Sequence, residues 1–575
     1  MEVNNLRDTE MDKECIKRYE EMKKSKSRMF DWLDYWVKVK PSEIALIEYN
    51  TDQKITWKDF ATKTKAFAAK LLSMGIKKGD VVATTLVLLK EHVYLMYACY
   101  RIGAIITPLD PRLKISEVDY CFSQMKPKAY FFLGPTPNAD FSKIAAAMME
   151  KHSDYCKNWI QFTGEKAIEG AQLVKDFAAD IKKIYIVQGL LLGKVKKAQK
   201  KVKSKDPCLI IFTTGSTGKP KPALLSHEAI LVQNINLMVG FSMKESDKMI
   251  INLPPSHVGC TTEQLATTIY GGGISILLHI FTPENSLDAV QKYKATLIGQ
   301  IPALYVMEWR LPNYKDYDLS SLRFAISAGQ SVTRKFLVRL KAMVPLVGTG
   351  LGLTETAGFV TYSPLDGTID DILASVGFDS PLYPISIREP MKSDGYAGDL
   401  KTKGEIGDIC FKGPQNFSGY LNNPEITAKT ISKDGFLYTG DLGTYDEKGL
   451  HFAGRAKFVI KPKGYQVYPP AVEEFLMSKL KDKISAIAIV GAPHEVFSEG
   501  VVCFVEKKPG VEVSIEDINK AAMEMASYKR PSHVVILEQG GIPLNRVAKT
   551  DYKTLTDMAK EITERLRSEG KWDAE

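Results

Sequence analysis

The sequence predicts an α/β protein with a large, multi-lobed N-terminal domain of parallel or mixed sheets and a small α+β C-terminal domain joined by a hinge. From Trp57 onward, short apolar runs alternate with segments whose apolar residues follow a helical period, which favours parallel strands with crossover helices. Near residue 455 the pattern changes to a compact stretch of about a hundred residues, a typical domain size. We therefore expect domains at residues 1–456 and 457–575.

The first elements follow a polar, helical extension over residues 1–28. Seven residues share one helical face before Gly75, which is placed as the helix C-cap; they are Phe60, Ala61, Thr64, Phe67, Ala68, Leu71 and Leu72. The next runs predict a strand, a helix and a strand, at Val81–Leu89, Glu91–Arg101 and Ala104–Thr107.

Later apolar runs are short and end in Gly, Pro or Ser. They predict strands at Leu209–Phe212, Thr296–Ile301, Leu322–Ser327 and Leu346–Gly348. Ligands of open α/β sheets bind at the carboxyl ends of strands, and three of these runs lead into polar clusters. The C-terminal stretch predicts strands at Ala486–Val490, Val501–Val505 and Val534–Leu537, with helices at Ile515–Ala526 and from Asp551.

Composition narrows the class of protein. The chain has 575 residues, of which 45% are hydrophobic and 25% charged, as in ordinary globular proteins. The formal charge of +9 is mild, and its concentration in Lys194–Lys205 indicates a solvated linker rather than a nucleic-acid surface. The eight cysteines form no metal or redox spacing, which favours a reducing compartment. With no signal peptide and no run long enough for an integral membrane segment, we expect a cytoplasmic protein.

The most informative segment follows the strand predicted at Leu209–Phe212. It consists of Thr213, Thr214, Gly215, Ser216, Thr217, Gly218, Lys219, Pro220 and Lys221. Small residues let backbone N–H groups approach an anion, while hydroxyls and lysines add donors and positive charge. Only two residues separate Gly215 from Gly218, so this is not a P-loop of the GxxxxGK[ST] kind. We interpret it as a loop that binds polyphosphate.

This loop resembles that of the adenylate-forming (AMP-binding) superfamily, and the resemblance extends over residues 40–560. Proline at position 222 replaces the usual glycine. The segment 254–259, Pro-Pro-Ser-His-Val-Gly, resembles the border of the family's carboxylate site, which implies that His257 gates the acyl pocket; a structural role for this histidine is equally plausible. Gly329 and Gln330 fall in the loop that lies against adenine, although a plain strand-to-helix turn would also explain them.

The segment 350–356 resembles the family's Tyr-Gly-x-Thr-Glu string. The resemblance places Gly350, Leu351 and Gly352 beside the nucleotide, with Leu351 in place of the usual tyrosine. It implies that Thr354 hydrogen-bonds the α-phosphate and that Glu355 helps to hold Mg²⁺, which prefers carboxylate oxygen.

The last motifs surround the predicted hinge. By resemblance, Asp441 binds ribose and Arg455 contacts the nucleotide. Lys457 is the hinge residue, and Gly464 passes close to pantetheine, although a glycine there also fits a plain turn. The segment 543–549 resembles the C-terminal Pro-x-x-x-x-Gly-Lys motif, with Ala548 in place of glycine, which makes Lys549 the catalytic lysine.

Together these motifs predict an acyl-CoA synthetase, an AMP-forming acid–thiol ligase that uses ATP, Mg²⁺ and CoA. We expect a small carboxylic acid as substrate, of medium-chain fatty, cyclic or aromatic type, and a monomer or homodimer without nucleic-acid partners. Three alternatives remain: an adenylation enzyme that serves a carrier protein, a luciferase, and a non-catalytic acyl- or nucleotide-binding member. The first would require an acid to pair with an amino group, and the segment 254–259 carries none.

Overall fold

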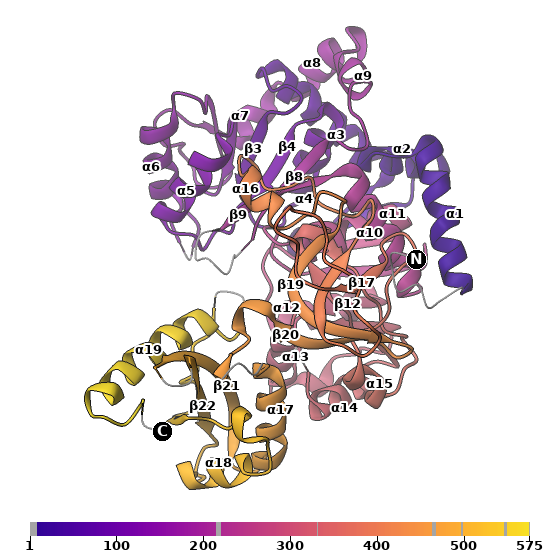
Figure 1. Cartoon of the computed structure of the whole chain (residues 1–575). Helices are drawn as coiled ribbons and strands as arrows, with labels where there is room; N and C mark the ends of the chain where they lie inside the picture. The colour runs from indigo at the N-terminus through magenta and orange to yellow at the C-terminus, as the bar shows by residue number, and fades with distance from the viewer. Residues whose placement is uncertain are drawn as a thin grey trace.

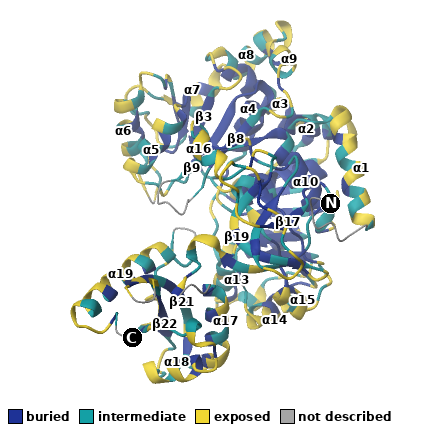
Figure 2. Cartoon of the chain, in the orientation of Figure 1, coloured by how far each residue is buried: buried dark blue, intermediate teal, exposed yellow. Residues whose placement is uncertain are grey.

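The computed structural model describes residues 9–137, 139–213, 220–330, 332–462, 467–495, 498–545 and 549–573. Two seven-stranded sheets form the body of the N-terminal part, each with one antiparallel strand at its edge. Buried residues gather along the strands and central helices such as α10, and exposed ones lie on outer helices (Figure 2). The predicted α/β fold class is therefore confirmed.

The first sheet has the strand order β14-β13-β12-β10-β11-β1-β2. Its strands are β1 (Ile44–Glu48), β2 (Gln53–Thr56), β10 (Lys248–Ile251), β11 (Ile274–Leu277), β12 (Leu297–Gln300), β13 (Phe324–Ser327) and β14 (Leu346–Gly348). The second sheet has the order β7-β6-β5-β3-β4-β8-β9. Its strands are β3 (Val81–Thr85), β4 (Ile105–Pro108), β5 (Ala129–Phe132), β6 (Asn158–Gln161), β7 (Gln172–Leu173), β8 (Pro207–Thr213) and β9 (Lys221–Ser226).

Helices cover both sheets, because parallel strands need crossover connections that return over the sheet faces. The largest hydrophobic core joins residues of both sheets, such as Leu46 and Val82, to the apolar faces of central helices. The longer helices here are α1 (Glu10–Ser25), α2 (Met29–Val39), α3 (Trp57–Ser73), α4 (Lys90–Ile102), α5 (Ile115–Met125), α6 (Ser142–His152), α10 (His227–Gly240), α12 (Pro283–Tyr293), α13 (Pro302–Trp309) and α14 (Arg334–Met343). The shorter ones are α7 (Val174–Ala179), α8 (Ile181–Ile184), α9 (Lys194–Gln199), α11 (Thr267–Gly271), α15 (Ile369–Ala374) and α16 (Pro424–Ala428), with π-helices η2 (Tyr185–Leu191) and η3 (Gly259–Ala266).

A four-stranded antiparallel sheet and a two-stranded ribbon lead to the C-terminal part. They consist of β17 (Ile385–Arg388), β18 (Gly407–Phe411), β19 (Leu437–Asp446) and β20 (Gly449–Arg455), and of β15 (Gly352–Leu353) and β16 (Gly358–Phe359). Short 3-10 turns lie at η1 (Tyr49–Thr51), η4 (Tyr314–Asp316), η5 (Thr354–Thr356), η6 (Ala456–Phe458) and η8 (Ser527–Lys529).

The C-terminal part contains one three-stranded sheet with helices on both faces. Its elements are α17 (Pro469–Leu480), β21 (Ile484–His494), β22 (Ser498–Lys507), α18 (Ile515–Ala522), β23 (His533–Leu537) and α19 (Tyr552–Ser568). Two hydrophobic clusters in this part draw all their buried residues from Ile460 onward. A separate core is what a small domain requires, and the boundary at residue 456 stays a prediction.

Several sequence expectations need correction in detail. The run Val81–Leu89 is a strand only to Thr85, because the chain turns there and enters α4 at Lys90. The helix predicted from Ile515 ends at Ala522. The Lys-rich segment is not a plain solvated linker: it contains α9, and Val195 is buried while its lysines are exposed. All eight cysteines are free thiols.

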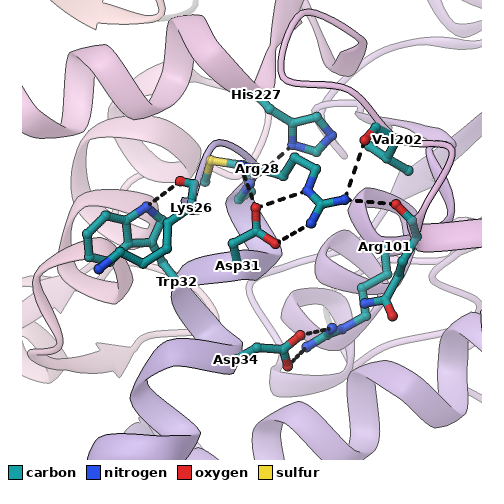
Figure 3. A network of polar contacts seen from close by, with 10 residues as sticks. Lys26, Arg28, Asp31, Trp32, Asp34, Arg101, Val202 and His227 are labelled. Atoms are coloured by element: carbon teal, nitrogen blue, oxygen red, sulfur yellow. Dashed lines mark hydrogen bonds and ion pairs between the residues drawn. The ribbon is translucent and has the colours of Figure 1, made fainter. Parts of the chain in front are cut away.

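The N-terminal extension folds against the body of the protein. Figure 3 shows how Arg28, between α1 and α2, donates to the carbonyl oxygens of Gln199 and Val202 at 2.9 and 3.4 Å. Nearby, the buried Arg101 makes two hydrogen bonds of 2.8 Å to the Asp34 carboxylate (Figure 3). This polar network joins α2, α4 and the Lys-rich segment. Among the described residues, no helix combines the length and apolar character needed to cross a bilayer.

Candidate active site

The predicted phosphate loop joins two paired strands. Thr213, the last residue of β8, pairs with Lys221, the first residue of β9, so the loop must reverse direction between them. Thr214, Gly215, Ser216, Thr217, Gly218 and Lys219 lie outside the described residues. Pro222 pairs with Phe212 in the hairpin, and its carbonyl accepts from Leu421 N at 2.9 Å. The proline therefore fits an edge strand, where its missing N–H matters little.

Thr354 and Glu355 lie in the 3-10 turn η5, between the strands of the β15–β16 ribbon. The Tyr420 hydroxyl donates to Glu355 Oε1 at 2.6 Å, which orients the carboxylate. Lys221 Nζ lies 5.4 Å from the centre of the Tyr420 ring. The ring therefore connects the predicted phosphate lysine with the predicted magnesium ligand. The sequence interpretation missed Tyr420, since it lies 65 residues beyond Glu355 and outside every motif.

Two glycines before η5 lie in close packing, which excludes a larger residue at Gly350 and leaves little room at Gly352. A Cβ at Gly350 would lie 2.0 Å from the carbonyl oxygen of Thr361. A Cβ at Gly352 would lie 3.3 Å from Glu263 Oε1. Between them, Leu351 is half-buried and packs against the core of the β17–β20 sheet. These contacts give the small residues of this string a structural reason.

Asp441 and Arg455 face each other across the antiparallel pair β19–β20. Arg455 Nε lies 2.9 Å from Asp441 Oδ1 and forms an ion pair with it, but its N–H is poorly aligned for a hydrogen bond to this buried oxygen. Burial raises the pKa of Asp441, and the charges of Arg455 and Lys549 oppose that rise. A buried carboxylate oxygen that lacks a donor fits a ligand hydroxyl.

Lys549 reaches this group from the C-terminal part of the chain. Its Nζ lies 3.6 Å from the position of a Cβ at Gly329, which has a φ of +86° and follows β13 by two residues. Burial and the nearby Arg455 charge lower the pKa of Lys549, while Asp441 raises it. The structure therefore brings Lys549, Gly329 and Asp441 together, although they are far apart in sequence. Gln330 is half-buried beside Gly329.

Lys457 adds a further positive charge at this end of the site. It lies in η6, and burial together with Arg455 and Lys221 lowers its pKa to about 8. Like charges that lower one another's pKa favour binding of an anion, because the anion stabilises the protonated forms. We define Lys221, Arg455, Lys457 and Lys549 as the cation cluster. Gly464 and Ala548 lie outside the described residues.

His257 precedes the π-helix η3, and its Nδ1 accepts from Gly259 N at 3.0 Å, which leaves the proton of the neutral ring on Nε2. Burial and the charge of Lys549 lower its pKa to about 4. The ring nevertheless keeps solvent access. Protein therefore packs densely around this residue, although part of it remains exposed. His257 therefore accepts from the first N–H of η3 and lies within the electrostatic reach of Lys549.

Glu263 is a residue that sequence reasoning missed. It lies on η3, and its carboxylate is next to three glycines: a Cβ would approach its oxygens to 3.6 Å at Gly259, 3.3 Å at Gly352 and 2.7 Å at Gly358. Burial raises its pKa to about 8, and a hydrogen bond from Phe359 N opposes the rise. A π-helix inside a helical segment frequently marks a functional site. No sequence pattern predicted this, since Glu263 occurs among threonines and a glutamine.

Gln233 lies beside Glu263. Its side chain is buried, and Nε2 has no acceptor among the described residues. The same Cβ position at Gly358 that lies 2.7 Å from Glu263 Oε1 lies 3.2 Å from Gln233 Nε2. We define His257, Glu263 and Gln233 as the uncharged recess, since near pH 7 none of them carries a full charge.

Comparisons with known proteins identify the family of the chain. Residues 33–421 match the family model described as AMP-binding enzyme, and residues 471–549 match the AMP-binding enzyme C-terminal domain. The chain is 27% identical to 4-coumarate–CoA ligase CCL1 of Humulus lupulus, over 90% of this chain and 91% of that protein. It is 28% identical to a long-chain-fatty-acid–CoA ligase of Bacillus subtilis (strain 168), over 85% and 88%. The solved structure of ATP-bound MatB from Rhodopseudomonas palustris has the same fold, with a TM-score of 0.76 and 23% identity over 93% and 99% of the two chains.

Proposed function

The chain belongs to the AMP-binding enzyme family, in its acyl-CoA synthetase branch, and from this premise we propose that it converts a carboxylic acid, ATP and CoA into acyl-CoA, AMP and pyrophosphate. The observation that carries the proposal is the position of Lys549 against Gly329 and within the electrostatic reach of Asp441 and Arg455. A lysine from one part of the chain then completes a site built by another.

In the first half-reaction, an oxygen of the substrate carboxylate attacks the α-phosphorus of ATP in line, and pyrophosphate leaves. Both reactants are anions, so the protein must hold them together and neutralise the charge that crowds at phosphorus. Lys549 is placed to bridge the carboxylate and the α-phosphate. The remaining members of the cation cluster contact the phosphates, and Asp441 Oδ1 accepts from a ribose hydroxyl.

The residues present fit magnesium that arrives with the nucleotide. Mg²⁺ is commonly held by one or two carboxylates together with substrate phosphates and water. Glu355 supplies one carboxylate, which Tyr420 orients through a single oxygen. In the part of the chain that the structure describes, no group of three His, Cys, Asp or Glu is arranged as a separate metal site. Bound magnesium would neutralise phosphate charge.

In the second half-reaction, the CoA thiol attacks the acyl carbonyl and AMP leaves. We propose that the C-terminal part rotates about Lys457, which would withdraw Lys549 and bring the segment around Gly464 to the site. Lys457 lies in the short 3-10 turn directly after β20, and a few residues at an element's end commonly absorb such a hinge motion.

For the substrate we propose a medium-chain, cyclic or aromatic acid. The relatives differ in the acids that their names give, 4-coumarate in one and long-chain fatty acids in another. A recess whose titratable groups are neutral near pH 7 suits an uncharged acyl chain, since it neither repels nor pairs with the chain. A protonated Glu263 can also donate to a polar atom on a ring.

Glu263 favours one second candidate. An ionised glutamate beside an acyl chain can pair with an amino group, which is the acid that the segment 254–259 lacks. The second candidate is therefore an enzyme that activates amine-bearing acids, with CoA or a carrier protein as acceptor. It predicts that amino acids compete with simple acids for adenylation.

The test is a mass-spectrometric product assay. The protein is incubated with Mg-ATP and CoA and a panel of short, medium, long, cyclic, aromatic and amino acids. ATP-dependent acyl-CoA from simple acids supports the proposal. Acyl-AMP without acyl-CoA would indicate a carrier-protein acceptor, and an aminoacyl product would favour the second candidate. Binding of ATP without any product would favour the non-catalytic alternative.

A further inference from the structure

The segment 181–205 forms a projection that the active site does not use. It contains α8, η2 and α9 and lies at the end of the molecule opposite the C-terminal part (Figure 1). We call it the projection.

The projection presents an apolar face to solvent. Five aliphatic residues are exposed within seven positions: Ile186 (44%), Val187 (41%), Leu190 (60%), Leu191 (76%) and Leu192 (51%). The π-helical bond from Leu192 N to Val187 O, 3.0 Å long, places residues five apart on one side. Such a dense group differs from the scattered single exposed residues of ordinary surfaces.

The opposite side of η2 packs against the body of the protein. Gly189 is buried, and a Cβ there would lie 2.6 Å from the Tyr185 ring and 3.6 Å from Ala69 Cβ on α3. The glycine therefore leaves room for the Tyr185 ring of the same helix, while Ala69 on α3 lies at ordinary contact distance. With the inner face fixed in this way, the leucines at positions 190–192 point outward because the fold places them there.

Positive charge surrounds this apolar face. The projection contains nine lysines and no acidic residue, and all nine lysines are exposed. Their number equals the formal net charge of +9 of the whole chain, so the formal charges of all other residues sum to zero. None of the nine forms an ion pair within the described residues. The lysines are 182, 183, 194, 196, 197, 200, 201, 203 and 205.

The protein holds the projection firmly. Arg28 donates to the carbonyl groups of Gln199, the last residue of α9, and of Val202 beyond it, and Lys78 Nζ donates to the Lys201 carbonyl at 2.9 Å. Val195 and Val202 are each 4% exposed and belong to the main core. A solvated linker would need none of these anchors.

We propose that the projection docks on the surface of a bilayer that contains anionic lipid. Leucines beside lysines match the interface, since apolar side chains enter the acyl boundary while ammonium groups meet the headgroups. A polynucleotide would leave the leucines exposed. A second copy of the projection would bring two groups of nine positive charges together. The C-terminal part lies at the opposite end of the molecule from the projection (Figure 1).

The test is co-sedimentation of the full chain with phosphatidylcholine vesicles, with or without about a third of phosphatidylglycerol. We expect binding to the anionic vesicles only, with at least a tenfold loss in 0.5 M salt. The variant Leu190→Ser/Leu191→Ser/Leu192→Ser, and separately Lys194→Gln/Lys196→Gln/Lys197→Gln, should each lose at least tenfold. The controls are Val338→Ser/Leu373→Ser and Lys54→Gln/Lys58→Gln/Lys63→Gln, which change exposed residues elsewhere and should bind as the parent chain does.

Thermal melting and acyl-CoA formation from a water-soluble acid should be the same in all these chains, which separates docking from folding and catalysis. Four results would overturn the proposal. These are no binding to anionic vesicles, equal binding by the leucine variant, stronger binding to duplex DNA than to the vesicles, and a dimer of the parent chain that the leucine variant lacks.

Discussion

The cation cluster and the uncharged recess treat charge in opposite ways. In the cluster, burial and the neighbouring Arg455 charge lower the pKa values of Lys457 and Lys549. In the recess, burial lowers the pKa of His257 to about 4 and raises that of Glu263 to about 8, so both are largely neutral at pH 7. On this difference we propose that the polyphosphate binds at the cation cluster and the acyl chain at the uncharged recess.

The largest effect is expected from Lys549→Ala. Loss of one preorganised charge at the transition state commonly costs about 10²–10³ in rate, so pyrophosphate release should fall by that factor. Thioester formation from supplied acyl-AMP should change little, since Lys549 acts in the first step. Lys553→Ala, an exposed lysine on α19, is the control. Equal loss in both half-reactions would remove the assignment of Lys549 to adenylation.

The second-largest effect is expected from Asp441→Asn, on the KM for ATP. Hydrogen bonds to charged groups contribute about 1.5–3 kcal/mol, so the KM for ATP should rise about 10- to 100-fold. The KM for the acid should stay within about twofold, because the recess is unchanged. Asp446→Asn, on the same strand, is the control. Steady-state kinetics with each substrate varied in turn measures both KM values. An equal rise in the two values would argue against the division of the site.

A smaller effect is expected on the pH dependence of the KM for ATP, which reports on the cation cluster alone. The pKa of Lys457 is lowered to about 8, so its positive charge is present below pH 8 and is lost above it. The KM for ATP should therefore rise by about fivefold between pH 7 and 9. Lys457→Gln should show the higher KM already at pH 7 and a flatter profile, whereas the exposed Lys448→Gln should follow the parent chain. A profile unchanged by Lys457→Gln would exclude this residue as the cause.

The smallest effect is expected on the pH dependence of the KM for the acid, which depends on Glu263 in the uncharged recess. Glu263 is mostly protonated below its pKa of about 8 and negative above it, so the KM for an anionic acid should rise a few-fold as pH passes 8. Glu263→Gln stays neutral and should keep the low KM, while its KM for ATP still follows Lys457. Asn234→Ala would disturb the neighbouring amide network without changing charge and is the control. A persistent rise in Glu263→Gln would contradict this assignment.

Much of the fold was predictable from local patterns. The strand at Leu346–Gly348 matches the prediction residue for residue, and Gly75 follows the helix end at Ser73 with a φ of +84°. The prediction of Val81–Leu89 as one strand was wrong at its end, since the apolar residues Leu86 and Leu88 are buried without belonging to a strand. An apolar run reports burial, and burial is not specific to strands.

The sequence by itself determined the family, the order of the strands that carry each motif, and the identities of Asp441, Arg455 and Lys549 as candidates. Only the tertiary structure placed Lys549 against Gly329, brought Glu263 and Gln233 beside Gly358, and turned the leucines of the projection outward. The physical reason is how far apart in the sequence the interacting residues lie. Periodicity and turn residues depend on neighbours a few positions away, whereas pKa values, orphaned donors and exposed apolar faces depend on segments that meet only when the chain is packed.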